Sequence, residues 1–405
     1  MARIRIYLAR HLCTAPRPQK EADALAAAGH EVTVHGVCFD PVSADRDAQL
    51  AQGRAWRWAP VADFTAKGQA TCWLVARLRH RLARDWFALT GRVTSEVWGY
   101  AQGALMRHAL QDPADLTIVH SEGGLAIAAE LHRRGQRIGV DYEDWFSRDL
   151  PTDQQRGRPV ERLAELEATL GRATPYATTT SRALAQALAT QFKGPAPSVI
   201  YNTFPAGPEP EVTSANGRAV ALHWFSQVIG PGRGLECLMA ALPGLTFNWM
   251  LHLRGEISSP YKNELLARLP AELSSRIQFH PTVSHDQLAT AIARHDIGLA
   301  LEESTIPSRN LTLTNKFFHY LQSGLAVVAS DTAGHREGLA LAPGAGVIFP
   351  AGNAEALASA LNRLAADPDS LLAARKAARN AFVATLAHET QAARYAALAS
   401  AALAH

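Results

Sequence analysis

The sequence has little of what marks secreted, membrane-spanning or nucleic-acid-binding chains. Its four cysteines lie far apart with no C-x-x-C pair, so no disulfide framework or metal site is indicated and a reducing cytoplasm is expected. No stretch approaches the roughly 18 apolar residues of a membrane span, and Arg3 and Arg5 interrupt the apolar run at the N-terminus, so no signal peptide is expected. Forty basic and 37 acidic residues leave a net charge of +3, too little to predict a nucleic-acid partner.

What the sequence does contain is an alternation of strand-like and helix-like segments. A chain of 405 residues exceeds what one hydrophobic core usually organises, so two domains are expected. Strand, loop, helix, glycine and strand follow one another in the first 40 residues, and such units build parallel sheets. The alternation restarts after a segment rich in Pro, Gly and Ser. We therefore predict an α/β protein with two Rossmann-like, doubly wound domains facing a cleft, where open α/β sheets bind ligands.

The boundaries follow from the same pattern. We expect an N-terminal domain at 1–204, a linker at 205–216, a C-terminal domain at 217–385 and a final helix at 386–405, for which a return to the N-domain is one option. The expected elements are strands at 4–8, 32–37, 116–120, 138–142, 177–180, 198–201, 219–225, 247–253, 277–280, 297–301 and 326–329, and helices at 21–28, 124–133, 160–174, 235–242, 261–269, 286–293 and 315–322.

A glycine-rich loop separates the strand at 219–225 from the next helix. It reads Gly230, Pro231, Gly232, Arg233, Gly234. Glycines let backbone N–H groups approach a ligand closely, and an arginine adds a planar charged fork suited to phosphate oxygens. The alternative is a tight turn that merely needs glycine. As a dinucleotide fingerprint the loop fails, because the third glycine of G-x-G-x-x-G is missing.

A polar cluster opens the helix at 315–322. Asn315, Lys316 and His319 lie near its start, and Lys316 and His319 are three residues apart and share a face. Phe317, Phe318 and Leu321 are expected to pack inward, and Gly324 ends the helix before a buried strand. A lone lysine is usually a solvated charge, but this cluster suits an anion better than average.

The stretch from Leu313 to Asp331 resembles the "p-x-K-l-x-E-Y-l-a-x-G-x-P-V-v-a-s" signature of glycosyltransferase family 4 and its GT-B relatives. Four other stretches are similar to that family in the same order along the chain. They are Arg17–Val34, Val140–Asp144, Thr180–Asn202 and Phe225–Leu242. The resemblance therefore covers nearly the whole chain.

The resemblance implies a nucleotide diphosphate sugar donor bound mainly by the C-domain, an acceptor bound mainly by the N-domain, and no divalent metal or other cofactor. Arg233 and Lys316 match the positive pair that stabilises the leaving diphosphate. That chemistry is sound by itself, because breaking a sugar–phosphate bond places negative charge on the leaving oxygens. The donor-binding residues are then expected to be Gly230, Gly232, Arg233, Gly234, Glu302, Glu303, Asn315, Lys316 and His319.

The sequence departs from the family at one motif. Members commonly carry two glutamates eight positions apart, where this chain has Leu311 and His319. Glu302 and Glu303 end the preceding strand and offer carboxylates, but at a different spacing. A histidine can still hydrogen-bond a ribose hydroxyl, and both phosphate-binding charges remain.

Polar residues also follow two strands of the first half. His120 and Glu122 lie in a loop where family members often place a functional histidine near the sugar; a strand-end histidine satisfied by a local carbonyl is the alternative. Glu143 and Asp144 follow the next strand and are candidates to orient or deprotonate an acceptor hydroxyl, or to cap the next segment. We take His120, Glu122, Asp144, Arg233 and Lys316 as the catalytic candidates.

The segment Trp73–Leu89 reads as a basic amphipathic helix. Leucines and Trp86 recur along one face, while five basic residues lie largely elsewhere. Such a helix is typical of membrane-surface elements. The alternatives are a helix that packs its leucines on the sheet, or aromatic residues Trp86, Trp98 and Tyr100 lining an acceptor groove.

The resulting hypothesis is a transferase that moves a sugar from a nucleotide sugar to a hydroxyl of a glycan or lipid-linked acceptor, with retention, in bacterial-type polysaccharide or glycoconjugate synthesis. A cytoplasmic location is expected, with peripheral contact to the inner face of the membrane through residues 73–89 as an option. Two alternatives stay open: another GT-B chemistry (an inverting transferase or a sugar-nucleotide epimerase), and a catalytically silent GT-B module that binds a glycan or a partner enzyme.

Overall fold

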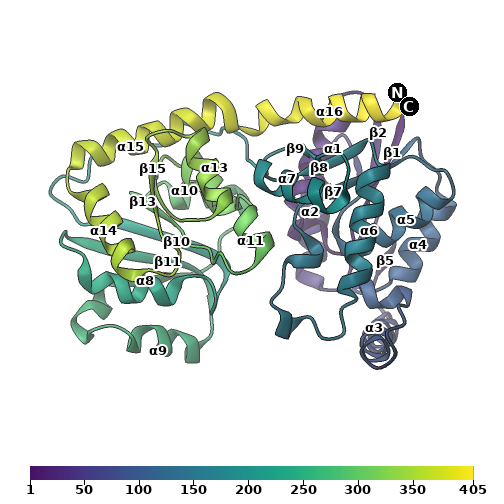
Figure 1. Ribbon diagram of the computed structural model, residues 1–405, viewed down its shortest axis with the longest axis horizontal. Coiled ribbons are helices and arrows are strands. Elements are labelled where there is room, and N and C mark those ends of the chain that lie inside the picture. Colours follow the sequence, from purple (N-terminus) through teal and green to yellow (C-terminus); the bar gives the residue numbers. More distant parts are fainter. Residues whose placement is uncertain (405) are drawn as a thin grey trace. The chain divides into compact units, whose positions relative to one another are not determined.

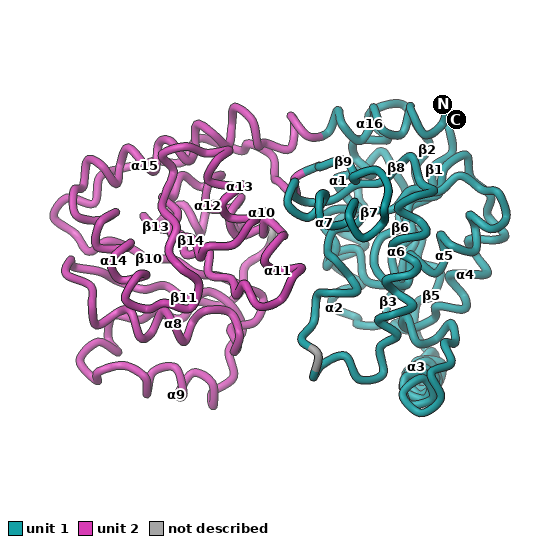
Figure 2. The backbone as a smooth tube through the Cα atoms, in the orientation of Figure 1, with its two compact units in different colours: residues 1–200, 392–405 teal, residues 201–391 magenta. Residues whose placement is uncertain are grey.

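The chain divides into two compact units, residues 1–200 with 392–405 and residues 201–391 (Figure 2). The computed structural model describes residues 1–404, apart from the side chains of Thr152, His285 and Asp286. Each unit contains one large parallel sheet with helices packed around it (Figure 1). The predicted α/β class with two Rossmann-like domains is confirmed.

The sheet of unit 1 has the strand order β4-β2-β1-β6-β7-β8-β9. Its strands are β1 (Arg3–Tyr7), β2 (Glu31–His35), β4 (Arg57–Trp58), β6 (Leu116–Val119), β7 (Ile138–Tyr142), β8 (Tyr176–Thr179) and β9 (Ser198–Val199); β3 (Val37–Cys38) and β5 (Ala62–Asp63) form a small separate sheet. The direction of strand progression reverses between β1 and β6. Ligands of doubly wound folds bind at the carboxyl ends of the strands that flank such a reversal.

The helices of unit 1 are α1 (Pro16–Ala27), α2 (Pro41–Ala51), α3 (Ala70–Thr90), α4 (Gln102–Gln111), α5 (Ser121–Arg133), α6 (Val160–Ala173) and α7 (Arg182–Phe192). The last helix, α16 (His388–Ala404), starts in unit 2, and its residues from Ala392 onward belong to unit 1. Tyr395, Ala399 and Ala402 are buried in the core of unit 1 beside Ile4 and Ile200. The chain end is thus part of the N-terminal fold.

Unit 2 has the strand order β12-β11-β10-β13-β14-β15, with the reversal between β10 and β13. Its strands are β10 (Val220–Ile229), β11 (Trp249–Ile257), β12 (Ile277–His280), β13 (Ile297–Ala300), β14 (Ala326–Ser330) and β15 (Gly346–Phe349). Its helices are α8 (Leu235–Ala241), α9 (Ser259–Ala267), α10 (His285–Ile292), α11 (Pro307–Leu311), α12 (Asn315–Gln322), α13 (Ala333–Leu341), α14 (Ala354–Ala365) and α15 (Pro368–Ala381).

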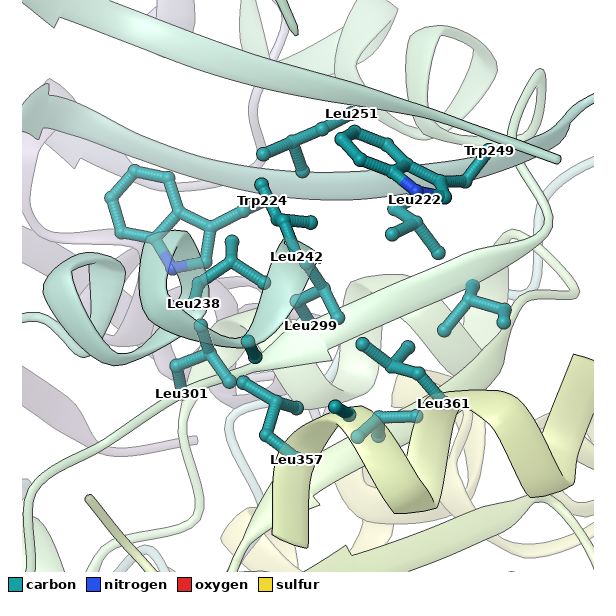
Figure 3. Packing of buried hydrophobic residues seen from close by; sticks show 14 of the residues in the cluster. Leu222, Trp224, Leu238, Leu242, Trp249, Leu251, Leu299, Leu301, Leu357 and Leu361 are labelled. Carbon is teal, nitrogen blue, oxygen red and sulfur yellow. The ribbon is translucent and has the colours of Figure 1, made fainter. Parts of the chain in front are cut away.

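The central strands of unit 2 are apolar because helices cover both faces of the sheet. Leu222 of β10 is in register with Leu251 of β11 and Ile297 of β13, and all three are fully buried. Leucines of α8 and α14 and the ring of Trp224 pack with them in one core (Figure 3). This rigid centre carries the loops that follow β10 and β13.

The segment 205–216 has no helix or strand, and it belongs to unit 2. The guanidinium of Arg379 on α15 donates to the backbone oxygens of Ala206, Gly207 and Pro208. The side chain of Arg379 is 4% exposed. The start of the expected linker is thus tied to α15, because one buried arginine binds three of its carbonyl groups; we call the segment 205–216 the strap.

Gly324 ends α12, as the sequence indicates. Its φ of +68° is left-handed, and the N–H of Leu325 donates to the carbonyl of Tyr320 at 2.9 Å, which is how helices commonly stop. A Cβ at this position would lie 2.8 Å from a methyl carbon of Val212 in the strap. Glycine is therefore required both by the backbone and by packing.

Candidate functional site

The glycine-rich loop of unit 2 lies directly after β10, at the strand-order reversal. Gly232 and Gly234 have left-handed φ values of +70° and +75°. A Cβ on Gly234 would approach the Cβ of Leu301, just after β13, to 2.8 Å, so glycine lets the loop pack against that strand end. Arg233 is half-buried and donates from Nη1 to the hydroxyl of Ser226 at 3.0 Å, which orients its guanidinium.

Lys316 forms a buried ion pair with Glu302. Its Nζ lies 2.6 Å from Glu302 Oε1, and each side chain is 11% exposed. Burial raises the pKa of Glu302, but Lys316 outweighs it and the net shift is downward, so the carboxylate is ionised. The ammonium also lies 5.5 Å from the centre of the Trp224 ring. A fixed positive charge thus stands at the carboxyl end of β13.

Two further charged residues meet the glycine loop. Arg309 on α11 donates from Nη1 to the carbonyl of Gly232 at 3.3 Å. Glu303 lies beside the same glycine: a Cβ built on Gly232 would be 3.9 Å from Oε1 of Glu303. Sequence reasoning missed Arg309; the signal available was a basic residue just ahead of the signature helix. The structure does bring Glu302 and Glu303, two of the predicted donor residues, to this edge of the sheet.

The N-cap of α12 is Thr314, whose side chain makes no capping hydrogen bond to the helix. The hydroxyl of Thr314 is buried without a hydrogen-bond partner among the described residues. Asn315 follows it and is half-buried. His319, in contrast, is buried in unit 2. Its ring stacks on Phe204 at 3.7 Å between centroids, and its Nδ1 lies 3.1 Å from the side-chain oxygen of Gln322. His319 therefore packs against Phe204, just before the strap, and contacts Gln322 of its own helix.

A cavity of about 280 Å³ opens at the strand-order reversal of unit 1. Arg10 after β1, Ser121 and Glu122 after β6, Trp98 and Arg158 are among its lining residues. Ser121 has a left-handed φ of +69°, although it is not glycine, and its buried hydroxyl has no partner among the described residues. Backbone strain with an unsatisfied hydroxyl is typical of functional sites.

Glu122 forms the wall of this cavity together with Arg158. The guanidinium of Arg158 binds the carboxylate of Glu122 and also that of Asp149 at 2.5 Å. The pKa of Arg158 is raised by these two carboxylates against the effect of burial. Glu122 is thus a hydrogen-bonded carboxyl group on the cavity wall. Its partner Arg158, like the strain at Ser121, could not be read from the sequence.

His120 lies beneath the cavity in a buried ionic network. Its Nε2 is 2.7 Å from Glu21 Oε2, and its Nδ1 is 3.2 Å from Asp141 Oδ2. Burial lowers the pKa of His120, but the two carboxylates raise it to about 9. The buried guanidinium of Arg17 binds the same Asp141 oxygen at 2.6 Å. His120 is therefore a cation held between carboxylates, and the alternative of a histidine satisfied by a local carbonyl does not describe it.

Asp144 lies after β7, among other acidic groups. Burial of the carboxyl, with Glu143 and Asp149 next in effect, raises the pKa of Asp144 to about 7, while Arg10 opposes the shift. A carboxyl that titrates near neutrality can accept or release a proton under working conditions. Perturbed groups of this kind concentrate at functional sites.

Helix α3 is exposed along nearly its whole length, since Ala83 is its one buried residue. Its apolar face is uncovered: Leu74, Leu78, Leu82, Trp86 and Leu89 are between 48% and 84% exposed. The alternative that these leucines pack on the sheet is therefore wrong. Among the described residues, no helix is both long and apolar enough to cross a membrane.

A groove of about 590 Å³ runs along α3 next to the cavity. Arg77, Arg81, Arg84 and Arg156 line it, together with Leu74 and Leu78. His80, Arg84 and Gly157 line both hollows, so the groove and the cavity adjoin. Of the aromatic residues considered for an acceptor groove, Trp98 lines the cavity, Tyr100 lines the groove and Trp86 is exposed on α3.

Known proteins resemble this chain both in sequence and in fold. Residues 222–367 match the model of the family "Glycosyl transferases group 1". No curated protein matches the sequence. The fold resembles that of Anabaena HepE in complex with UDP and glucose (15% identity, TM-score 0.69, 99% of this chain and 100% of that chain).

Two other solved structures are similar over the same length. Sucrose-phosphate synthase from Thermosynechococcus elongatus has 15% identity and a TM-score of 0.70, with all of both chains covered. A point mutant of S. aureus TarM, in complex with Fondaparinux, alpha-GlcNAc-glycerol and UDP, has 9% identity and a TM-score of 0.69, with 98% of this chain and 99% of that chain covered. Residues 222–367 thus carry the sequence pattern of the family "Glycosyl transferases group 1", and the chain as a whole has the two-domain GT-B fold of these solved structures.

Proposed function

We propose that this protein transfers a glycosyl unit from a nucleotide diphosphate sugar to a hydroxyl of a glycan or lipid-linked acceptor, with retention of configuration, in bacterial-type polysaccharide or glycoconjugate synthesis. The observation that carries the proposal is the gathering of Lys316, Glu302, Arg309 and the glycine loop at the strand-order reversal of unit 2. Solved structures of similar fold contain UDP, UDP-glucose or a glycan.

In this proposal Arg233 and Lys316 bind the donor diphosphate. The bond between sugar and phosphate breaks as negative charge builds on the leaving oxygens, and cations held in place beforehand stabilise that charge without reorganising. Ser226 and Glu302 hold the two cations before the donor arrives. Gly230, Gly232 and Gly234 let the backbone approach the phosphates, and no metal ion is assigned a role.

The remaining donor contacts are assigned by position. Glu303 and Asn315 flank the proposed diphosphate site and offer a carboxylate and an amide to the ribose or the sugar. His319 contributes by fixing α12 against Phe204, and its ring is our proposed contact to the ribose. Glu302 supplies a carboxylate near the place of the family's missing glutamate pair.

The acceptor is proposed to bind in the cavity of unit 1. Glu122 and Arg158 offer a carboxylate and a cation for sugar hydroxyls, and the unsatisfied hydroxyl of Ser121 faces no competing partner among the described residues. Asp144 is proposed to orient or deprotonate the acceptor hydroxyl. His120 acts as a positioning residue, because it holds the strand end that carries Ser121.

Peripheral contact with the cytoplasmic face of the membrane through α3 is part of the proposal. The exposed leucines would enter the interface while the arginines of the groove meet anionic lipid. A lipid-linked acceptor would then be presented next to the cavity that adjoins the groove.

A catalytically silent GT-B module is the second candidate, favoured by Leu311 and His319 at the positions of the family's glutamates. The test is a panel of nucleotide sugars with candidate acceptors, in which released nucleoside diphosphate is measured with and without EDTA. We expect release that EDTA does not abolish and that Lys316→Ala lowers strongly, with the exposed Lys376→Ala as matched control. Binding of a nucleotide sugar without release, for every donor and acceptor, would instead support the silent module.

A further inference from the structure

Three side chains able to bind a metal meet between β2 and α4 of unit 1. His35 ends β2, His108 lies in α4, and Asp112 follows the last residue of α4. One ligand atom from each lies within 4.8 Å of the other two. His35 Nε2 is 3.7 Å from Asp112 Oδ2, and the two imidazole rings are 4.5 Å apart between centroids.

The ring of His35 presents an unused nitrogen to this cluster. His35 is 2% exposed, and its Nδ1 lies 2.9 Å from the carbonyl oxygen of Ala59. A carbonyl only accepts, so Nδ1 carries the proton and Nε2 of the neutral ring carries a lone pair. That Nε2 is buried with no hydrogen-bond partner among the described residues. A buried unsatisfied nitrogen costs free energy that a bound ligand would recover.

The side chains of His108 and Asp112 are each held in place by a hydrogen bond to a neighbouring side chain. The hydroxyl of Tyr7 is 2.9 Å from His108 Nδ1, and Arg5 donates from Nε to Asp112 Oδ2 at 2.8 Å. Metal-binding histidines and carboxylates commonly have such outer partners, which fix the ring and the tautomer. His108 and Asp112 are half-buried, so an ion has a path from solvent.

We propose that His35, His108 and Asp112 bind one zinc ion or a similar divalent transition metal. Two imidazoles and one carboxylate are a donor set that zinc accepts, with water completing a tetrahedron. Ligand atoms about 2.0–2.1 Å from zinc lie roughly 3.3 Å apart, so the present separations need only modest contraction. The ion would fasten the end of α4 to the sheet, a stabilising role independent of the proposed transfer reaction.

A second cluster in the same unit provides a matched control. His11, Cys38 and Asp47 also lie within 4.8 Å of one another. There, however, the imidazole is fully used: Nδ1 is 2.7 Å from Asp47 Oδ2, and Nε2 accepts the backbone N–H groups of Phe39 and Asp40. No ring nitrogen is left for an ion, so this cluster is a hydrogen-bonded anchor for the loops.

The experiment uses the full-length protein after chelator treatment. Zinc is added, and the bound metal per chain and the melting temperature are measured. Cobalt is then substituted to read the visible absorption of a tetrahedral ion. We expect one tightly bound ion per chain and a raised melting temperature. Cys38→Ser should bind the ion as tightly as the wild type. His108→Gln and Asp112→Asn should each weaken binding more than about 100-fold, since even outer partners are worth 10- to 100-fold.

Circular dichroism of the two variants verifies that they fold. Wild-type protein that retains no ion and shows no change in melting temperature would overturn the proposal. So would wild-type affinity in both His108→Gln and Asp112→Asn, or loss of binding in Cys38→Ser, which would place the ion in the other cluster.

Discussion

Lys316 lies 2.6 Å from Glu302, with both side chains 11% exposed. Burying two charges costs desolvation free energy, which their attraction offsets only when the geometry is good. At a diphosphate site this cost has a use, because the ammonium is charged and held in place before the donor binds. Arg233 is held in a similar way by Ser226.

We expect Arg233→Ala and Lys316→Ala each to lower turnover by about 100- to 1,000-fold, the usual cost of losing one preorganised donor. Because both would act on one diphosphate, the double variant should lose less than the product of the single effects. Lys316→Arg should also be harmful, since a planar fork does not replace a compact ammonium paired to Glu302. Steady-state release of nucleoside diphosphate measures this. Near-normal turnover in both alanine variants would refute the donor-site assignment.

The buried carboxyl of Asp144 is expected to lower the stability of the folded protein when it ionises. The pKa of its carboxyl is raised to about 7 in the folded protein, above its usual 3.8. The folded state therefore holds this proton more tightly than the unfolded state, and stability is lost as the pH rises from about 4 through 7. Asp144→Asn, which cannot ionise, should raise the melting temperature at pH 8 but hardly at pH 4.

The same variant should lower kcat/KM by about 100-fold or more if Asp144 is the base, since general bases contribute roughly 10²- to 10⁴-fold. It should also remove the rise of kcat/KM with pH near 7. Asp45→Asn, at an exposed carboxyl on α2, is the comparison. Unchanged rate and pH profile in Asp144→Asn would leave Asp144 with a structural role only.

At the scale of elements, α3 is the outlier. Of its 21 residues only Ala83 is buried, while leucines and arginines are both exposed. An uncovered apolar stripe beside basic side chains has the physical character of a helix that lies in a membrane interface. Each basic residue near an anionic surface contributes about 1 kcal/mol.

Reversing the charge of Arg77, Arg81 and Arg84 to Glu should therefore reduce cosedimentation with anionic vesicles by well over 100-fold at low salt, since about 3 kcal/mol of attraction is replaced by repulsion. The control reverses three exposed arginines at the other end of the unit's helices, with equal change in net charge. These are Arg133, Arg134 and Arg137, which lie at the end of α5 and in the turn before β7. No vesicle binding by the wild type, even at low salt, would assign α3 to another partner.

Adjacent strands of unit 2 carry a row of histidines. His223 of β10 is in register with His252 of β11, whose Nδ1 is 3.0 Å from His280 Nε2, and the ring of His295 lies within 4.5 Å of both His223 and His252. Burial, with neighbouring histidines and Arg254 adding to it, lowers the pKa of His252 and of His295 to about 4. All four rings are thus neutral at pH 7.

Neutral histidines of this kind predict acid lability. The folded-state pKa values near 4 lie below the unfolded value of 6.5, so the unfolded state binds more protons between these limits. The contribution of these rings to stability should be full above pH 6.5 and fall as the pH drops toward 4, opposite in sign to the contribution of Asp144. His295→Gln should flatten that dependence, while the exposed His132→Gln should not. Urea unfolding of the wild type and both variants at pH 7.5, 5.5 and 4.5 measures it, and the same pH dependence in the wild type and in His295→Gln would contradict the burial of these rings.

At the scale of the whole molecule, the two units share one helix. Tyr395 of α16 is 2% exposed in the core of unit 1, although the residues before Ala392 belong to unit 2. Tyr395→Ala should therefore destabilise unit 1 by about 3–5 kcal/mol, as large-to-small aromatic changes do. Phe382→Ala, at a fully buried site after α15, should do the same to unit 2.

Calorimetry distinguishes the two effects. On the proposed function, a nucleoside diphosphate that binds the protein should, at about 100 times its dissociation constant, stabilise only the transition of unit 2, by about 2.7 kcal/mol. The expectation is that Tyr395→Ala moves the transition that this nucleotide leaves alone. If Tyr395→Ala and Phe382→Ala lower one common transition equally, the units unfold together and the separate assignment is wrong.

Several elements could be predicted to the residue because their signals are local. The strand Ile138–Tyr142 and the helix Asn315–Gln322 match the expected bounds, since an apolar run marks the strand and Gly324 follows the helix as its stop. The two-residue strands β4 and β5 and the helix α2 were not predicted. They are too short or too mixed in composition for a period to appear, and tertiary pairing forms the strands.

The sequence by itself determined the α/β class, the repeated doubly wound pattern and the positions of Arg233 and Lys316, because periodicity and motif spacing are properties of adjacent residues. Only the tertiary structure decided which partner each charge has. His120 meets Glu21 from 99 positions away, and Lys316 meets Glu302 across a strand end. It also decided that the leucines of α3 are uncovered, because a period shows which residues share a face and not whether anything packs on it.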